Sequence, residues 1–483
     1  MCRPTACAAF AAGILLTGSL AAGQDKPMSL VRVSPRDPRY FELSDGRAFV
    51  PIGLNMIQPP FVETPEERLA GMERWMKALS ANGGNYLRVW LGAEYWDVEH
   101  ARSGAYDDAK AERIDALLAL ARKQGLRVKM TLEHFRDFDG KKAWCNKAIH
   151  HVANGGPAES IADFFDGAKP REQFKRKLAW FAKRYGDDPA VFGWELWNEM
   201  DCVRAGDYVA WTDVMLAELH RLLPDVLAMQ SFGSFDNDSK RARYRRLCTT
   251  KGNDVAQVHR YLDLGARLEV CHGPVDVLAA DAVGEVLSCR PGRPVLLAES
   301  GAVEPGHSGP FKLYAADKAG TILHDVLFAP FFAGAAGGGQ IWHWDHYVDR
   351  NDLWWQFGRF AKAVEGLDPP AEGFVPMRLD TPRLRVYVLA GKRTLLAWCR
   401  DVRNPWKAEL AEGKAPETVR GASVDLGKAP GASAAAGAET YDPWRDVRRE
   451  AKLDGTTVAL PDFQRSIVVR LRRSAVPRGA GAQ

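Results

Sequence analysis

The chain has 483 residues, of which 46% are hydrophobic and 26% charged, and its formal net charge is +4. This length is sufficient for one large globular domain with a smaller one beside it. The small net charge argues against a nucleic-acid partner, which would require a dense basic patch.

The first residues are typical of a targeting segment. Arg3 precedes the apolar run AAFAAGILLTGSLAA, and small residues follow before Gln24. This pattern predicts a signal peptide over residues 1–23. The run is too short to span a membrane comfortably, and no other segment approaches spanning length. We therefore expect a secreted or periplasmic protein with no membrane partner after cleavage.

From residue 48 to about 366, short apolar runs alternate with longer amphipathic stretches. The runs are rich in β-forming residues: FVPIGLN (49–55), NYLRVWL (85–91), LRVKMTL (126–132), VFGWELW (191–197), DVLAMQSF (225–232), VAQVHRY (255–261), PVLLAES (294–300) and GQIWHW (339–344). The stretches between them carry apolar residues at helical spacing, and several end in glycine. Eight such pairs predict an α/β fold of the (β/α)8 barrel type. A doubly wound open sheet is the alternative, but no phosphate-binding glycine motif follows the first run.

The barrel domain is expected to occupy residues 24–368. A hairpin turning at Ser44-Asp45-Gly46 precedes the first barrel run and is expected to close the bottom of the barrel. A Pro-containing linker follows the last helix, and several strand-like segments beyond it predict a small β-sandwich over residues 375–473. Residues 474–483 are expected to form a disordered tail.

In such barrels the reactive groups lie at the carboxyl ends of the strands. The residues that end the eight runs form a polar and aromatic set: Asn55, Arg88, Trp90, Glu133, His134, Asn198, Glu199, Ser231, Phe232, His259, Tyr261, Glu299, Trp342, His343 and Trp344. Because the strands are parallel, these side chains are expected to share one face of the barrel.

Two carboxylates from different strands, Glu199 and Glu299, suit glycoside cleavage, which requires a proton donor and a nucleophile. Arg88 and Tyr261 are placed to donate hydrogen bonds to one carboxylate and to keep it ionised. We expect that negative charge to raise the pKa of Glu199, so that Glu199 retains its proton. Asn198 is expected to hold a sugar hydroxyl.

The stretch FGWELWNE, followed a hundred residues later by LLAESG, resembles the retaining β-glycosidases of clan A and glycoside hydrolase family 5 in particular. The resemblance implies that Glu199 is the acid/base and Glu299 the nucleophile. It also implies substrate-binding roles for the following residues: Arg88, His134, Asn198, His259, Tyr261 and one of Trp342 and Trp344. Met200 departs from the family, which usually has proline or valine at this position.

Other carboxylates and histidines carry different expectations. Strict alternation along a strand places Glu195 and Trp197 in the barrel interior together with Glu199. A carboxylate at that depth must be paired, and Arg88 is the expected partner of Glu195. His343 and the Asp345-His346 pair could suggest a metal, but adjacent strand residues point apart, so neither a metal nor a cofactor is expected.

Six cysteines follow the predicted signal peptide, and they lack the CxxC spacing of a structural zinc site. Cys145 and Cys202 lie in adjacent loops on the same barrel face and are expected to form a disulfide in an oxidising compartment. For the other four, pairing and simple burial both remain open.

The sequence therefore predicts a secreted retaining hydrolase whose partner is a β-linked polysaccharide or oligosaccharide. A non-catalytic carbohydrate-binding barrel is the alternative. The choice between β-mannan and β-glucan, and between endo and exo action, stays open, as do the role of the C-terminal domain and the oligomeric state.

Overall fold

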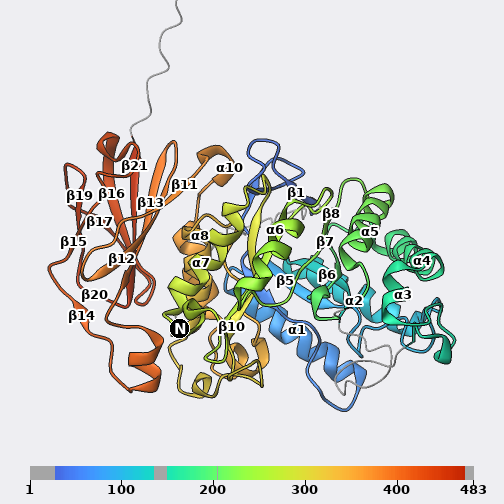
Figure 1. Ribbon diagram of the computed structural model, residues 1–483. Coiled ribbons are helices and arrows are strands. Elements are labelled where there is room, and N and C mark those ends of the chain that lie inside the picture. The colour runs from blue at the N-terminus through green and yellow to red at the C-terminus, as the bar shows by residue number, and fades with distance from the viewer. Residues whose placement is uncertain (1–27, 135–148, 204, 474–483) are drawn as a thin grey trace, which may run out of the picture.

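The computed structural model describes residues 28–134, 149–203 and 205–473. Two parts of the chain lie side by side (Figure 1): an α/β part on one side, and a C-terminal β part, coloured orange to red, on the other. The predicted signal peptide over residues 1–23, the predicted tail over residues 474–483 and Cys145 lie outside the described residues.

Seven parallel strands form the wall of the barrel. They are β4 (Gly53–Asn55), β5 (Tyr86–Trp90), β6 (Arg127–Glu133), β7 (Val191–Trp197), β8 (Leu227–Met229), β9 (Ala256–Leu262) and β10 (Val295–Ala302). Strands β4 to β8 pair in sequence order, and β9 pairs with β10. The predicted eighth strand is reduced to Ile341, which bridges Leu54 and Ser300 in parallel and so closes the ring. This arrangement is a (β/α)8 barrel.

Close strand approach explains one glycine in the barrel wall. A Cβ at Gly53 would lie 1.7 Å from the carbonyl oxygen of Tyr86. Any side chain there would force β4 away from β5. The pairing of these two strands places Asn55 opposite Arg88. The two polar residues that end these strands are therefore held as direct neighbours.

Ten helices occur in the described residues. They are α1 (Pro65–Ala81), α2 (Asp108–Gln124), α3 (Ile161–Asp166), α4 (Ala168–Tyr185), α5 (Tyr208–Leu222), α6 (Arg241–Thr249), α7 (Val275–Ser288), α8 (Thr321–Phe332), α9 (Trp355–Val364) and α10 (Pro369–Glu372). The short helix α10 lies in the segment that the sequence indicated as a linker.

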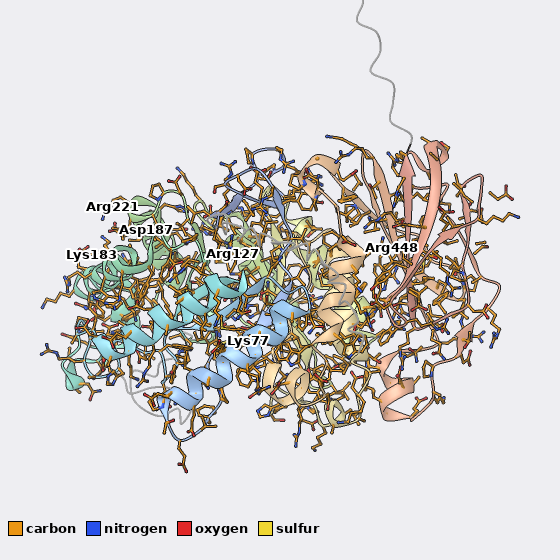
Figure 2. All side chains as sticks on the ribbon, turned by 180° about the vertical axis from the view of Figure 1, so that it is seen from behind. Lys77, Arg127, Lys183, Asp187, Arg221 and Arg448 are labelled. Atoms are coloured by element: carbon orange, nitrogen blue, oxygen red, sulfur yellow. The ribbon has the colours of Figure 1, made fainter. Side chains whose placement is uncertain are left out.

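Local signals explain where the long helices start and stop. Thr64 and Glu67 form a capping box before α1, with Pro65 at its first position. Asp107 caps α2, which ends at Gly125 in the left-handed conformation. Figure 2 shows the covering helices from behind, with the exposed Lys77 on α1 and Lys183 on α4.

The predicted N-terminal hairpin is present, and it lies where the sequence suggested. Strands β1 (Val31–Val33), β2 (Phe41–Leu43) and β3 (Ala48–Phe49) form a small antiparallel sheet. The ring of Phe192, at the start of β7, packs against Phe41 and Phe49 with centroids 5.2 and 6.2 Å apart. The hairpin therefore contacts the amino end of the barrel, opposite the predicted site.

The C-terminal part is built from antiparallel sheets. The largest has the order β11-β12-β13-β21-β16-β17. Its strands are β11 (Val375–Arg378), β12 (Leu384–Ala390), β13 (Thr394–Asp401), β16 (Ala435–Asp442), β17 (Val447–Ala451) and β21 (Ser466–Arg473). The short strands are β14 (Thr418–Val419), β15 (Ser423–Asp425), β18 (Leu453–Asp454), β19 (Thr457–Ala459) and β20 (Phe463–Gln464). A separate apolar core lies between the large sheet and these short strands, as in a β-sandwich.

The other face of the large sheet is fixed to the barrel helices. Arg400 of β13 forms a buried ion pair with Asp325 of α8, with 2.8 Å between Nε and Oδ1. Arg385 of β12 pairs with Asp276 of α7 at 2.5 Å. Trp398 continues the barrel core into the sheet. The two parts therefore share an interface that contains buried charges as well as apolar side chains.

Candidate active site

Glu199 and Glu299 meet at the carboxyl end of the barrel strands. Glu199 lies two residues beyond β7 with φ 49° and ψ 51°, in the left-handed region that side chains other than glycine rarely adopt. Glu299 lies in β10 just after a register shift that follows Leu297. One carboxylate oxygen of each residue and one ring nitrogen of His259 lie within 4.8 Å of one another. The structure therefore brings the two carboxylates together.

Glu299 is surrounded by hydrogen-bond donors. The Tyr261 hydroxyl donates to Oε2 at 2.8 Å, and Arg88 Nη1 forms an ion pair with Oε1. Only 3% of Glu299 is exposed, so both donors act in a largely desolvated site. These are the two donors that the sequence assigned to one carboxylate.

Arg88 is the centre of the polar network below the site. Its Nε donates to Oε2 of Glu195 at 2.8 Å, which confirms the expected pairing of Glu195. Its Nη2 donates to Oδ1 of Asn198 at 2.6 Å, and Asn198 also lines the cavity described below. One guanidinium thus aligns the nucleophile candidate, Asn198 and an interior carboxylate.

Glu199 is held in a less polar setting. His259 Nδ1 lies 2.8 Å from Oε1, and the Cys202 thiol lies 3.9 Å from Oε2. Burial raises the pKa of Glu199 to about 7, and the nearby Asp201 adds to this effect while His307 opposes it. The predicted rise of the Glu199 pKa is confirmed. The expected cause, the charge of Glu299, is wrong, because desolvation makes the largest contribution to this rise.

His259 lies between the two carboxylates. Its Nδ1 is 3.4 Å from Oε2 of Glu299 as well as 2.8 Å from Glu199. Burial lowers the pKa of His259 to about 4, against the opposing pull of Glu299. The imidazole is therefore neutral near neutral pH, and it orients the carboxyl groups without adding a positive charge.

A cavity of about 500 Å³ opens above these groups. Glu199, Glu299, Asn198 and Tyr261 line it, together with Trp342 and Trp344. Trp342 is partly exposed, whereas Trp344 is 7% exposed and packs edge-on against Trp75 with centroids 6.3 Å apart. Trp342 therefore offers the more accessible ring face to a sugar.

His134 occupies a different position from the other predicted residues. It is 5% exposed, and its ring stacks on Trp90 with centroids 5.0 Å apart. Trp90 lines the cavity and also contacts Trp342 at 5.0 Å. His134 thus supports an aromatic wall of the cavity from behind and is not among the residues that line it.

Sequence analysis did not single out two residues that line the cavity. His307 has φ 60° and contacts Asp263 at 3.0 Å and the Ser234 hydroxyl at 3.2 Å. Phe61, which follows Pro59-Pro60, is 73% exposed at the cavity rim. Both lie in loops after strands, where local pattern alone does not show which side chains turn inward.

The prediction for Trp197 is wrong. Its ring packs against Phe164 and Phe165 of α3, at 5.7 and 5.8 Å, and against Trp211 of α5, at 6.3 Å. The side chain therefore lies among helices instead of in the barrel interior. Trp197 is the last residue of β7, so the alternation that places Glu195 in the interior does not determine the direction of this final side chain.

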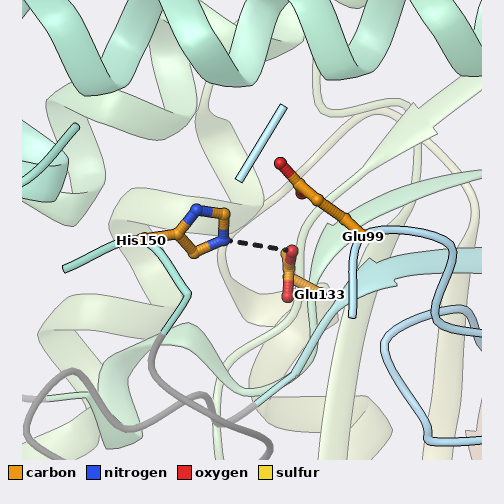
Figure 3. Close-up of side chains that lie close together, drawn as sticks. All are labelled: Glu99, Glu133 and His150. Atoms are coloured by element: carbon orange, nitrogen blue, oxygen red, sulfur yellow. Dashed lines mark ion pairs between the residues drawn. The ribbon is translucent and has the colours of Figure 1, made fainter. Parts of the chain in front are cut away.

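A second charged group, the peripheral cluster, comprises Glu99, Glu133, His150 and Lys177, and each of these residues is 3% exposed or less. Figure 3 shows the first three. His150 Nε2 lies 3.7 Å from Glu133 Oε1. The ammonium of Lys177 is 3.0 Å from Glu99 and also contacts Glu133. Burial alone would raise the pKa of Glu99, but Lys177, His150 and the backbone amide of Gly104 together outweigh it and lower that pKa. Lys177 thus occupies the position that a cation would take between the carboxylates.

No helix within residues 28–134, 149–203 and 205–473 combines the length and apolar character that a bilayer crossing requires. The predicted partner of Cys202 lies outside these residues, so the disulfide stays a prediction.

Comparisons with known proteins agree with the geometry. A family model described as Cellulase (glycosyl hydrolase family 5) matches residues 61–269. A mannan endo-1,4-beta-mannosidase of Oryza sativa subsp. japonica is 26% identical over 258 residues, which are 47% of this chain and 54% of that protein. The chain thus spans about half the length of this relative.

Solved structures show the same fold at low identity. One described as a glycoside hydrolase has a TM-score of 0.59 at 14% identity, over 92% of this chain and 97% of that chain. An exo-beta-1,4-mannosidase from Opitutaceae bacterium strain TAV5 has a TM-score of 0.50 at 18% identity, over 69% of this chain and 62% of that chain. The family match and the sequence relative show that the chain is similar to glycoside hydrolases of family 5, within clan A. The solved structures show the barrel fold.

Proposed function

We propose that the protein hydrolyses a β-linked polysaccharide or oligosaccharide with retention of configuration, and that β-mannan is its substrate class. The observation that carries the mechanism is the approach of Glu199 and Glu299, whose nearest oxygens lie within 4.8 Å. Retaining enzymes place their carboxyl groups about 5–5.5 Å apart, whereas inverting enzymes need about 6.5–9.5 Å to admit a water molecule. The mannan preference rests on the sequence relative named above.

In the first step, Glu299 attacks the anomeric carbon while Glu199 gives its proton to the departing glycosidic oxygen. A covalent glycosyl-enzyme forms, and the shortened glycan leaves. Arg88 and Tyr261 bind the two oxygens of Glu299 and orient this carboxylate for attack. Burial raises the pKa of Glu199 to about 7, so Glu199 is protonated when the pH is below this value.

In the second step, the ionised Glu199 takes a proton from water, and the resulting hydroxide attacks the same anomeric carbon. The bond to Glu299 breaks, and the two inversions give net retention. Asn198 is placed to hold a hydroxyl beside the reacting carbon, because Arg88 fixes its carbonyl oxygen. Trp342 is the proposed sugar platform, because it is the more exposed of the two candidate tryptophans.

The test compares the native protein with Glu299→Gln on β-mannan, β-glucan and other β-glycans, with product release measured over time. We expect native activity on β-mannan, no turnover by the variant, and a β-configured first product by NMR. Glu304→Gln is the matched control, because Glu304 follows the same strand but does not line the cavity. A fully active Glu299→Gln variant would refute the assigned nucleophile, and an inverted first product would refute double displacement. Binding without hydrolysis by the native protein would instead favour a carbohydrate-binding barrel.

A further inference from the structure

The barrel interior below the site contains an unusual balance of charge. Arg88, Lys129, Glu195 and Glu299, here called the interior cluster, comprise two cations and two carboxylates. Their side chains are 0 to 4% exposed. Buried charges of this kind are tolerated only when each has a partner. Removing any member therefore alters the charge that the others experience.

Lys129 comes from the middle of β6, and the proposed mechanism above does not use it. Its ammonium contacts the side-chain carbonyl of Gln257 and lies 3.6 Å from Oε1 of Glu195. The Oε2 atom of the same carboxylate accepts hydrogen bonds from Arg88 and from Thr131. Glu195 is thus shared between Lys129 on one side and Arg88 on the other.

Arg88 in turn is shared between two carboxylates. Its Nε and Nη2 bind Glu195 at 2.8 and 2.5 Å, and its Nη1 binds Glu299. Without a second cation, Glu195 and Glu299 would have to divide a single guanidinium. One uncompensated negative charge would then remain among largely desolvated side chains, which favours protonation of a carboxylate.

We propose that Lys129 is a positioning residue for the reaction: by neutralising Glu195, it leaves the Arg88 guanidinium free to hold Glu299 ionised. This inference rests on the proposed function, because it assigns a second layer of support to the same nucleophile. Lys129 does not touch the cavity and acts only through its neighbours.

The electrostatics of the neighbouring groups support this role. Burial alone would raise the pKa of Glu195, but Arg88, Lys129, the Thr131 hydrogen bond and His259 together outweigh it and hold that pKa well below its usual range. Arg88 and then Lys129 are the largest of these four contributions. Burial lowers the pKa of Lys129 to about 7, against the opposing pull of Glu195 and Glu299. Below that pH the lysine is protonated.

The charged and titratable groups that face Lys129 come from four other strands. They are Arg88 on β5, Glu195 on β7, and His259 and Glu299 on β9 and β10. Among these, His259 is neutral above its lowered pKa of about 4. The charge balance therefore depends on the four members of the interior cluster.

The test follows the acidic limb of the pH profile of kcat/KM, which reports ionisation of the nucleophile in the free enzyme. In Lys129→Met we expect this limb to move up by about one pH unit, which is the low end of the effect of a nearby charge. Activity on the acidic side then falls about tenfold, while the plateau is retained. The double variant Lys129→Met/Glu195→Gln removes one charge of each sign and is expected to return the limb toward its native position.

Glu195→Gln alone leaves two cations and one carboxylate, and we expect its acidic limb to move down. Thermal melting will show whether Lys129→Met folds. If it does not fold, the pH profile of Glu195→Gln alone tests the proposed role of Lys129. Three results would overturn the proposal. The first is a loss of activity in Lys129→Met that is equal at every pH, and the second is an acidic limb in the double variant that lies as high as in Lys129→Met. The third is an acidic limb in Glu195→Gln that stays in place or moves up.

A second measurement separates this inference from the proposed function. The Glu299 carboxyl is titrated by NMR in protein containing 13C-carboxyl glutamate, with its signal assigned by its loss in Glu299→Gln. Loss of Lys129 should raise this pKa whether or not a substrate is known, and an unchanged pKa would contradict the role of Lys129. Absence of any hydrolase activity, in contrast, would contradict only the proposed function.

Discussion

The interior cluster and the peripheral cluster are both buried, both contain two carboxylates, and each includes one residue of β6. They differ in access. Glu299 of the interior cluster lines the 500 Å³ cavity, whereas Glu99, Glu133, His150 and Lys177 do not line it. A buried charged group is therefore not by itself a site, because chemistry also requires a route for substrate to the charge. The predictions below test this difference.

The largest expected effect is on catalysis at the cavity. Glu199→Gln should lower kcat/KM on a natural β-glycan by about 10²–10⁴-fold, the usual contribution of a general acid or base. With an aryl glycoside whose leaving group needs no proton, the first step should lose much less. Initial rates on the two substrates provide the measurement, and equal losses on both would show that Glu199 is not the proton donor.

The peripheral cluster should respond in stability and not in catalysis. Lys177→Met leaves Glu99 and Glu133 without their shared cation, and we expect the free energy of unfolding to fall by about 3–5 kcal/mol. Activity per folded molecule should not change. Urea unfolding and active-site titration measure the two quantities separately.

Lys175→Met is the matched control on the same helix. The Lys175–Glu172 pair is 30% and 60% exposed, so its loss should change stability by less than about 1 kcal/mol. If Lys175→Met destabilised the protein as much as Lys177→Met, the effect would be a general property of α4 and not of the buried cluster.

The pH dependence of kcat/KM tests the protonation of Glu199 at the cavity. Glu199 must be protonated to act as the acid, and burial raises its pKa to about 7. The kcat/KM should therefore be retained below this value and fall as pH rises through it, by about tenfold for each further unit. Glu199→Gln should lack this alkaline limb on the aryl glycoside. A native limb near the ordinary glutamate value of about 4.3 would contradict the assigned effect of burial.

The smallest expected effect concerns the wall of the cavity. Trp342→Ala should raise KM by about tenfold, equivalent to about 1.4 kcal/mol of lost binding, with a smaller change in kcat. Trp180→Ala is the control, because Trp180 is also partly buried but stacks on Tyr106 away from the cavity. Steady-state kinetics of the two variants on the same glycan check this, and equal KM values would remove Trp342 from the proposed platform.

Much of the candidate site could be predicted because parallel strands place their carboxyl ends on one face. Glu199 and Glu299 could be paired from their positions after two apolar runs, although a hundred residues separate them. His134 and Trp197 show the limit of this reasoning. Position at a strand end does not determine where a side chain points once the backbone leaves the β conformation.

Lys129 was not foreseen for a related reason. A lysine inside the run LRVKMTL marks a charge within a strand, but its partners Glu195 and Gln257 come from strands far along the chain. The cause of the raised Glu199 pKa could not be predicted from the sequence either, because desolvation depends on every segment that packs around the carboxyl group.

The sequence by itself determined the order of strands and helices, the start and stop of the capped helices, and the two carboxylates at strand ends. These features depend on residues close together in the chain. Only the tertiary structure decided that Arg88 joins Glu195 to Glu299, that Lys129 balances their charge, and that Lys177 lies between the carboxylates of the peripheral cluster. Such choices depend on distance and burial in space, since the interaction of two charges depends on their separation and on the surrounding solvent.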